Sequence, residues 1–165
     1  MIAVTGHTSG IGKEIYDTVN GCNGFSRSNG YDICNPSDRQ KILSSEFDIL
    51  INNAYDGIGQ TLLLLDFFTR FQNTNKTIIN VGSRIAEDFI VLPDDYQHLL
   101  TYQLYKKSLK SLSCDLYALN KSANIKYIWF GYVGTDVILA KYPGITDYIT
   151  VDNAVMQILQ LADDA

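Results

Sequence analysis

The sequence predicts an α/β fold in which a parallel sheet lies between two layers of helices. Short apolar runs rich in β-branched residues alternate along the chain with longer stretches of helical apolar spacing. Such alternation indicates a parallel sheet with helices on both faces. A glycine-rich turn also follows the first apolar run directly. The 165 residues, 46% of them hydrophobic, suffice for a single domain over residues 1–165, without a visible repeat or linker.

The first elements follow from apolar spacing. Residues 2–5 are a short strand, and residues 11–19 have helical spacing. Residues 24–26 are a second, brief strand. A turn at residues 28–30 then leads directly into another short apolar run at residues 31–34, which leaves no room for a helix between them. We therefore expect one crossover helix to be reduced to a turn.

The remaining elements continue the alternation. Asn35 or Ser37 can cap a helix that opens at residues 36–39. We expect strands at residues 47–51, 77–81 and 125–130, and helices at residues 60–72, 96–120 and 152–161. No strand follows the last helix, so the doubly wound sheet should lack a final strand. Ligands bind beyond the carboxyl ends of the strands in such sheets, so the informative residues should follow strands.

Charge and cysteine content argue against several classes of protein. The net charge of -5 and the pI near 4.8 are unlike those of a nucleic-acid binder, which needs clustered Lys and Arg. The N-terminus lacks the basic region and long apolar stretch of a signal peptide or membrane anchor, so we expect a cytoplasmic protein. Cys22, Cys34 and Cys114 lie far apart without a CxxC pair, so neither a metal site nor a disulfide framework is expected.

The turn after the first strand has the context that dinucleotide binding requires. Residues 5–12 read Thr-Gly-His-Thr-Ser-Gly-Ile-Gly and open the first helix. Gly6 permits a tight turn, Gly10 lets the backbone approach a pyrophosphate, and Gly12 allows close helix packing. The helix N-terminus would face the anion. An ordinary strand-to-helix turn is the alternative interpretation of this pattern.

This glycine spacing resembles the TGxxxGIG turn of the short-chain dehydrogenase/reductase family. The matching residues are Thr5, Gly6, Gly10, Ile11 and Gly12, with Thr8 and Ser9 at variable positions. The resemblance implies a Rossmann-type, three-layer αβα fold with a nicotinamide cofactor. It covers nearly the whole chain, which is shorter than the usual family member.

Arg27 is a candidate for reading the adenosine end of the cofactor. It stands between Ser26 and Ser28 at the end of the second strand. A basic residue there favours NADP(H) over NAD(H), because it can bind the 2′-phosphate. A solvated surface arginine is the alternative.

The resemblance implies two further groups of cofactor-binding residues on this side. In the family an Asp followed by an apolar residue after the third strand contacts the adenine, and the matching pair is Asp32 and Ile33. The Asn-Asn-Ala-Gly motif after the next strand is matched by Asn52, Asn53 and Ala54, with Tyr55 in place of glycine. Paired Asn side chains can bond backbone groups and tie neighbouring strand ends together.

Tyr102 and Lys106 lie four residues apart on an expected helix, so both project from one face. A nearby ammonium favours the phenolate and lowers the pKa of a tyrosine, so Tyr102 could exchange a proton with a carbonyl or alcohol oxygen. Ser83 follows a strand and could bond the same oxygen. The resemblance assigns the catalytic roles of the family to Ser83, Tyr102 and Lys106. A chance pairing among the 11 tyrosines is the alternative.

The segment after the last strand resembles the Pro-Gly-x-x-x-Thr segment that meets the nicotinamide in the family. It supplies Gly131, Val133 and Thr135, while Phe130 replaces the usual Pro. The Asn that many members place as a fourth catalytic group has no clear match, and Gln60 is the nearest polar candidate. The substrate loop, residues 137–149, is brief.

The residues and the resemblance together indicate an NAD(P)-dependent oxidoreductase acting on a small-molecule carbonyl or alcohol, with NADP(H) preferred. A non-catalytic NADP-binding redox sensor or regulatory protein is the alternative, and a sugar-nucleotide epimerase would need a larger C-terminal region. The apolar stretch at residues 62–68 lies where family members often pair subunits. A homodimer is therefore possible, and ordinary core packing is the competing explanation. We expect neither nucleic acid nor membrane as a partner.

Overall fold

A computed structural model describes residues 1–87 and 99–164 and contains one five-stranded sheet in the order β2-β1-β3-β4-β5. All neighbouring strands pair in parallel. The strands are β1 (Ile2–Thr5), β2 (Asn23–Phe25), β3 (Ile49–Asn52), β4 (Thr77–Ser83) and β5 (Asn124–Phe130). The predicted doubly wound α/β fold is therefore confirmed, and every strand points its carboxyl end toward the same edge.

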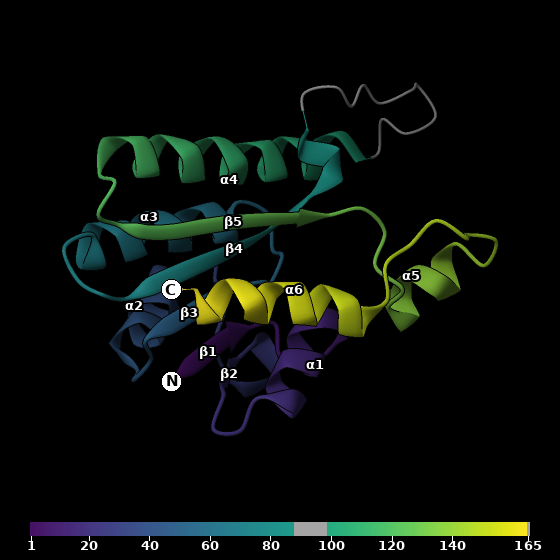
Figure 1. Ribbon diagram of the computed structural model, residues 1–165, viewed down its shortest axis with the longest axis horizontal. Helices are drawn as coiled ribbons and strands as arrows, with labels where there is room; N and C mark the ends of the chain where they lie inside the picture. The colour runs from purple at the N-terminus through teal and green to yellow at the C-terminus, as the bar shows by residue number, and fades with distance from the viewer. Residues whose placement is uncertain (88–98, 165) are drawn as a thin grey trace.

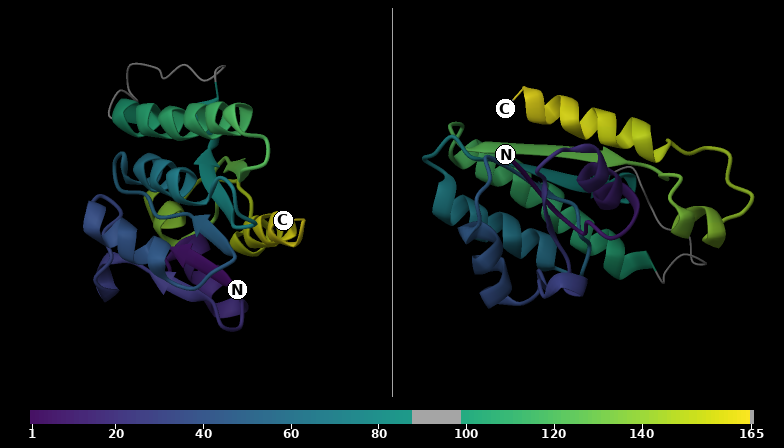
Figure 2. Two further views of the ribbon diagram at one scale, coloured as in Figure 1. Left: turned by 90° about the vertical axis from the view of Figure 1, so that its left-hand side faces the viewer. Right: turned by 90° about the horizontal axis from the view of Figure 1, so that it is seen from below.

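Helices cover both faces of the sheet (Figures 1 and 2). One face carries α1 (Gly10–Thr18) and α6 (Val151–Asp163), which contact each other. The other carries α2 (Pro36–Ser44), α3 (Gly59–Phe71) and α4 (Leu100–Leu119). The short helix α5 (Asp136–Lys141) lies beyond the carboxyl end of β5. Among the described helices, none combines the length and the apolar character needed to cross a membrane.

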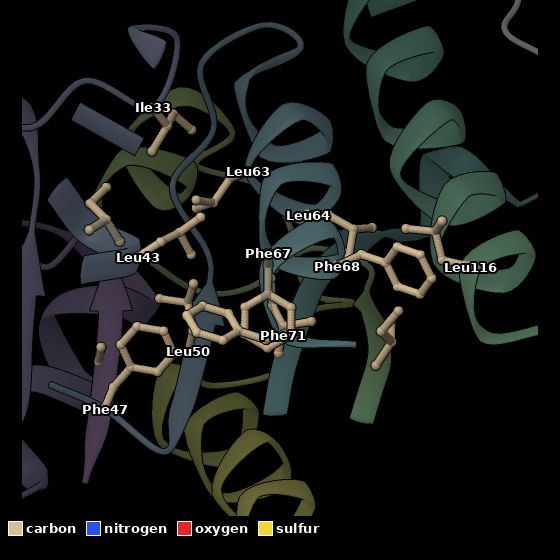
Figure 3. Close-up of a cluster of buried hydrophobic side chains, with 14 of the residues drawn as sticks. Ile33, Leu43, Phe47, Leu50, Leu63, Leu64, Phe67, Phe68, Phe71 and Leu116 are labelled. Carbon is tan, nitrogen blue, oxygen red and sulfur yellow. The ribbon is translucent and has the colours of Figure 1, made fainter. Parts of the chain in front are cut away.

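The sheet divides the apolar interior into two clusters. In β3, Leu50 packs into the cluster under α2, α3 and α4, whereas Ile51 packs into the cluster under α1 and α6. Successive side chains of a strand point to opposite faces, so a strand covered on both faces must be apolar throughout. Figure 3 shows the first cluster, in which the rings of Phe47 and Phe71 meet edge to face with centroids 5.8 Å apart.

The segment between β2 and α2 departs from the expected order of elements. A single 3-10 turn, η1 (Arg27–Asn29), stands in place of a crossover helix, as expected. Residues 31–34 form no strand, because the Asp32 carboxylate accepts the Cys34 backbone N–H at 2.7 Å and bends the chain into a turn. The sheet therefore ends at β2, one strand earlier than the resemblance to the family implies.

Two other boundaries differ from expectation. The long helix expected at residues 96–120 is described from Leu100 onward, and residues 96–98 lie outside the described part of the chain. The expected substrate loop contains α5, whose first turn is capped by the Thr135 hydroxyl. A parallel bridge between Val133 and Ile149 then joins the two ends of this loop.

Candidate active site and cofactor site

The turn between β1 and α1 has a backbone shape that side chains would obstruct. Gly6 and Gly10 have φ values of 77° and 52°, in the left-handed region that favours glycine. A Cβ on Gly12 would lie 2.2 Å from the carbonyl oxygen of Gly6. The backbone can therefore come close to a ligand at this turn, and α1 can begin close to β1.

The N-terminus of α1 is suited to an anion. Ser9 occupies the N-cap position without a side-chain hydrogen bond to the helix, and the first turn contains no acidic residue. Neither a cap nor a carboxylate therefore competes for the partial positive charge of the helix N-terminus. The turn fits the pyrophosphate of a dinucleotide, which the chain would hold through backbone amides.

Thr5 holds the end of β1 next to the loop that follows β3 through hydrogen bonds. Its hydroxyl, fully buried, accepts hydrogen bonds from the backbone N–H groups of Asn53 and Ala54 at 3.0 and 2.9 Å. Asn53 Nδ2 in turn donates to the Thr5 carbonyl oxygen at 3.1 Å. Thr5, expected to bind cofactor, instead fastens β1 to the loop after β3. Asn53 forms the expected tie between strand ends and also lines the cavity described below.

At the adenosine end, Arg27 is exposed but carries an ion pair. Its guanidinium lies 3.3 Å from the Asp56 carboxylate, and its side chain is 75% exposed. Ser26 and Ser28 share a hydrogen bond between their hydroxyls at 2.8 Å. The arginine thus stands on the surface beside β2, where a 2′-phosphate would have to displace Asp56.

The expected adenine pair is not arranged as the resemblance implied. Ile33 is 5% exposed and packs into the core under α3, because residues 31–34 turn inward before α2. Asp32 uses its carboxylate to hold the turn through Cys34. In this arrangement, Ile33 cannot present its side chain to a bound adenine.

Ser83, Tyr102 and Lys106 converge in one cavity of about 1130 Å³. Ser83 ends β4, whereas Tyr102 and Lys106 lie one turn apart on α4. A hydrogen bond joins the side chains of Ser83 and Tyr102, and the Lys106 ammonium lies 5.8 Å from the centre of the Tyr102 ring. The three residues expected to act together therefore line the same cavity.

Lys106 is held by two buried oxygen atoms. Its ammonium donates to Gln60 Oε1 at 2.7 Å and to the Val81 carbonyl oxygen at 3.0 Å. The Gln60 amide nitrogen donates to the Asn52 carbonyl oxygen at 2.7 Å. Gln60, which lies on α3, is 2% exposed. Its buried side-chain amide therefore connects the end of β3 to Lys106.

Asn52 belongs to this buried support rather than to a cofactor surface. Its Nδ2 donates to the Gln60 carbonyl oxygen and to Asn80 Oδ1, both at 2.9 Å. The residue is fully buried. Asn52 thus ties β3 to α3 and β4, as its proposed strand-tying role predicted, and does not face the cavity.

The pKa values of the two ionisable groups differ from expectation. Burial lowers the pKa of Lys106 to about 7. Burial also raises the pKa of Tyr102 above its ordinary value, although the hydrogen bond with Ser83 lowers it. The expected lowering by Lys106 is therefore overturned, because removal from water disfavours the charged form of both groups.

The segment after β5 contacts Gly10 at the end of the turn between β1 and α1, residues 6–9, which we call the phosphate turn. Gly131, Val133 and Thr135 line the cavity. The methyl group of Thr135 would lie 3.0 Å from a Cβ on Gly10. The segments expected to hold the pyrophosphate and the nicotinamide therefore lie against each other beside the three catalytic candidates.

Several aromatic residues that were not predicted as site residues line the same cavity, among them Tyr55 and Trp129. Tyr55, which stands where the family motif has glycine, packs edge to face on Tyr102 with ring centroids 4.8 Å apart. Trp129 lies near the end of β5 and is the only tryptophan in the chain. The departure from glycine at Tyr55 was a visible signal in the sequence, whereas no local pattern distinguished Trp129 from a core residue.

Searches against protein-family models and against curated proteins find no match. Solved structures do match. A short chain dehydrogenase from Burkholderia cenocepacia J2315, in complex with NADP, aligns with a TM-score of 0.69 at 16% identity, over 95% of this chain and 87% of that one.

Two further matches are a 3-alpha-hydroxysteroid dehydrogenase and a carbonyl reductase. The former, from Pseudomonas sp. B-0831 and complexed with NADH, has a TM-score of 0.69 at 18% identity, over 97% of this chain and 88% of that one. The latter, from chicken fatty liver with NADPH bound, has a TM-score of 0.67 at 17% identity, over 96% and 89%. The chain thus has the Rossmann-like fold of the short-chain dehydrogenases/reductases.

Proposed function

We propose that this protein is a nicotinamide-dependent oxidoreductase that reduces a carbonyl group, or oxidises an alcohol in the reverse direction. The observation that carries the proposal is the convergence of Ser83, Tyr102 and Lys106 in one cavity beside an open helix N-terminus. The similar solved structures bind NADP, NADPH or NADH, which supports the cofactor class.

Tyr102 is the general acid in the proposed reduction. Its raised pKa keeps the phenol protonated at neutral pH, so it can donate a proton to the carbonyl oxygen. The Ser83 hydroxyl holds that oxygen next to the phenol. A bound reduced nicotinamide would supply the hydride.

Lys106 stabilises the phenolate that Tyr102 leaves behind. With a pKa of about 7, its ammonium is partly protonated at neutral pH and can respond to a negative charge forming next to it. Gln60 orients the ammonium through its side-chain oxygen. We propose that this direct amide contact takes the place of the fourth catalytic group for which the sequence has no clear match.

NADP(H) is the proposed cofactor, with Arg27 as the residue that binds the 2′-phosphate. The exposed guanidinium pairs only with Asp56 among the described residues. Such exposed pairs contribute little, roughly 0 to 1 kcal/mol. A phosphate can therefore replace the carboxylate at small cost.

A redox sensor that binds NADP(H) without turnover remains the second candidate. The departure from the family on the adenosine side, where residues 31–34 form no strand, favours it. The buried lysine counts against it, because burying an ammonium is costly and a sensor has no use for one at this position.

The test is a titration of the purified protein with NADPH and with NADH, followed by NADPH oxidation against a panel of ketones and aldehydes. We expect NADPH to bind more tightly and at least one carbonyl compound to be reduced. Binding without turnover of any panel member would favour the sensor, and failure to bind either cofactor would contradict both candidates.

A further inference from the structure

Several aromatic side chains form one wall of the cavity. Trp129, Tyr132 and Tyr148 line it, with exposures of 42%, 45% and 42%. The ring of Tyr142 meets that of Tyr132 edge to face at 5.6 Å, and Tyr55 stands beside Tyr102. Such a wall offers planar contact surfaces, on which another aromatic ring gains both burial and stacking.

Basic side chains exceed acidic ones among the described residues that line this cavity. Besides Lys106, the charged groups are Arg84, Lys141 and Asp147. This excess contrasts with the net charge of -5 of the whole chain. The cavity is therefore a local site of positive charge, which favours an anionic ligand.

Arg84 has the position and the freedom to bind such an anion. It follows Ser83 directly, and its side-chain Cδ would lie 3.8 Å from a Cβ on Gly131, so it lies across the carboxyl ends of β4 and β5. Its guanidinium has no hydrogen bond or ion pair within residues 1–87 and 99–164, whereas Arg39 is paired with Asp66. A planar guanidinium left free in this way matches the geometry of a carboxylate.

The phosphates of a cofactor have other binding positions in the chain. The phosphate turn follows β1 and Arg27 follows β2, whereas Arg84 follows β4. In the order β2-β1-β3-β4-β5, β4 stands two strands from β1 and three from β2. At about 4.8 Å per strand, these separations are roughly 10 and 14 Å. Arg84 thus lies on the substrate side, next to the group that would hold the reacting oxygen.

We propose that the substrate is an aromatic carbonyl compound that carries a carboxylate, with its ring on the aromatic wall and its carboxylate on Arg84. This inference rests on the proposed function and specifies its substrate class. In the reduction, the carbonyl carbon gains a hydride from NADPH and the oxygen gains the Tyr102 proton. The products are the alcohol and NADP⁺, and the phenolate recovers a proton from solvent.

A matched pair of substrates tests the carboxylate. We would compare 4-acetylbenzoate with 4-acetylbenzamide, which have the same ring and the same ketone. The wild type should reduce the carboxylate with a kcat/KM at least about tenfold higher, because one charge-assisted bond is worth that much. Arg84→Met should bring the ratio of the two values close to one. Lys121→Met, which removes an exposed cation far from the cavity lining, should keep the ratio.

Binding can be measured separately from turnover through Trp129, the only tryptophan. Quenching of its fluorescence by 4-acetylbenzoate should need a concentration about tenfold higher in Arg84→Met. If no carbonyl compound is reduced but this difference persists, the anion site stands and the proposed reaction fails. Equal kcat/KM values for the two ketones in the wild type would overturn the inference. A loss of NADPH affinity in Arg84→Met as large as the loss of substrate affinity would also overturn it.

Discussion

Lys106 is a buried cation that has no carboxylate partner among the described residues. Only 4% of it is exposed, and its ammonium donates hydrogen bonds to the neutral oxygens of Gln60 and Val81. A neutral environment of this kind favours the uncharged amine, which explains why its pKa falls to about 7. Lys106 therefore lowers the free energy of unfolding at any pH at which its buried amine is protonated.

Stability should for this reason rise with pH more steeply in the wild type than in Lys106→Met. Between pH 7 and the ordinary lysine value of 10.5, the folded chain holds fewer protons at this residue than the unfolded chain. At about 1.4 kcal/mol per pH unit, the wild type should gain about 2 kcal/mol on the variant between pH 7 and 9. Urea unfolding at the two pH values measures the difference. Parallel stability curves for the two proteins would show that Lys106 is not titrating in the folded state.

Tyr102→Phe tests the proposed proton donor. Turnover should fall by roughly 10² or more, since general acid catalysis contributes about that factor, while NADPH affinity changes little. Tyr105→Phe is the matched control, because it removes a phenol from the same helix at a residue outside the cavity lining. Steady-state rates of both variants decide the matter. Unchanged turnover in Tyr102→Phe would remove this residue from the mechanism.

Substitutions of Arg27 and Asp56 should change the affinity for NADPH in opposite directions. Arg27→Ala should weaken NADPH binding about tenfold or more and leave NADH binding nearly unchanged, because only NADPH carries the 2′-phosphate. Asp56→Asn should strengthen NADPH binding by up to about fivefold, because the competing ion pair is lost. Fluorescence titrations with both cofactors measure these changes. Equal losses of NADH and NADPH affinity in Arg27→Ala would show that this residue does not bind the 2′-phosphate.

At the scale of elements, the strand-turn-helix unit of β1 and α1 depends on the absence of a side chain at Gly12. A methyl group there would overlap the Gly6 carbonyl oxygen at 2.2 Å, so the helix would have to move away from the strand. Gly12→Ala should cost at least about 1 to 3 kcal/mol of unfolding free energy and weaken binding of either cofactor. Gly144→Ala, whose Cβ would meet nothing within 4 Å, is the control. Equal free energies of urea unfolding for the two variants would show that Gly12 does not lie this close to the Gly6 carbonyl oxygen.

The packing of α3 bears on the predicted homodimer. Within residues 62–68, Leu65 alone is exposed, and most of the other side chains are buried against the sheet and α4. Core packing therefore accounts for most of the apolar stretch. The homodimer stays a prediction, and this stretch as a whole does not supply an exposed apolar surface for it.

At the scale of the whole molecule, both apolar clusters share one sheet. Leu50 and Ile51, adjacent in β3, belong to different clusters, so neither cluster can lose its packing without disturbing the same strand. We expect one cooperative unfolding transition, as is usual for chains of this size. Urea unfolding followed by Trp129 fluorescence and by far-UV circular dichroism should give coincident curves. Separate midpoints for the two probes would show that the chain unfolds in more than one unit.

How well the sequence predicted this protein depends on the distance over which each feature is decided. Strands and helices were placed within a few residues, because apolar spacing is a local property of the chain. The strand implied at residues 31–34 was wrong, because an Asp side chain bonded its neighbouring backbone and turned the chain before it could pair. Thr5 and Asn52 were expected to bind the cofactor, whereas both are buried and hold neighbouring strands together, a role that had been predicted only for the Asn pair.

By itself, then, the sequence determined the α/β class, the glycine turn, and the spacing of Tyr102 and Lys106 on one helix. Only the tertiary structure decided the chemical state of the site. Gln60 meets Lys106 across 46 residues of chain, and burial of both catalytic candidates reversed the expected shift in the pKa of Tyr102. The reason is that desolvation and long-range hydrogen bonds depend on all the groups packed around a residue. The local sequence does not contain that information.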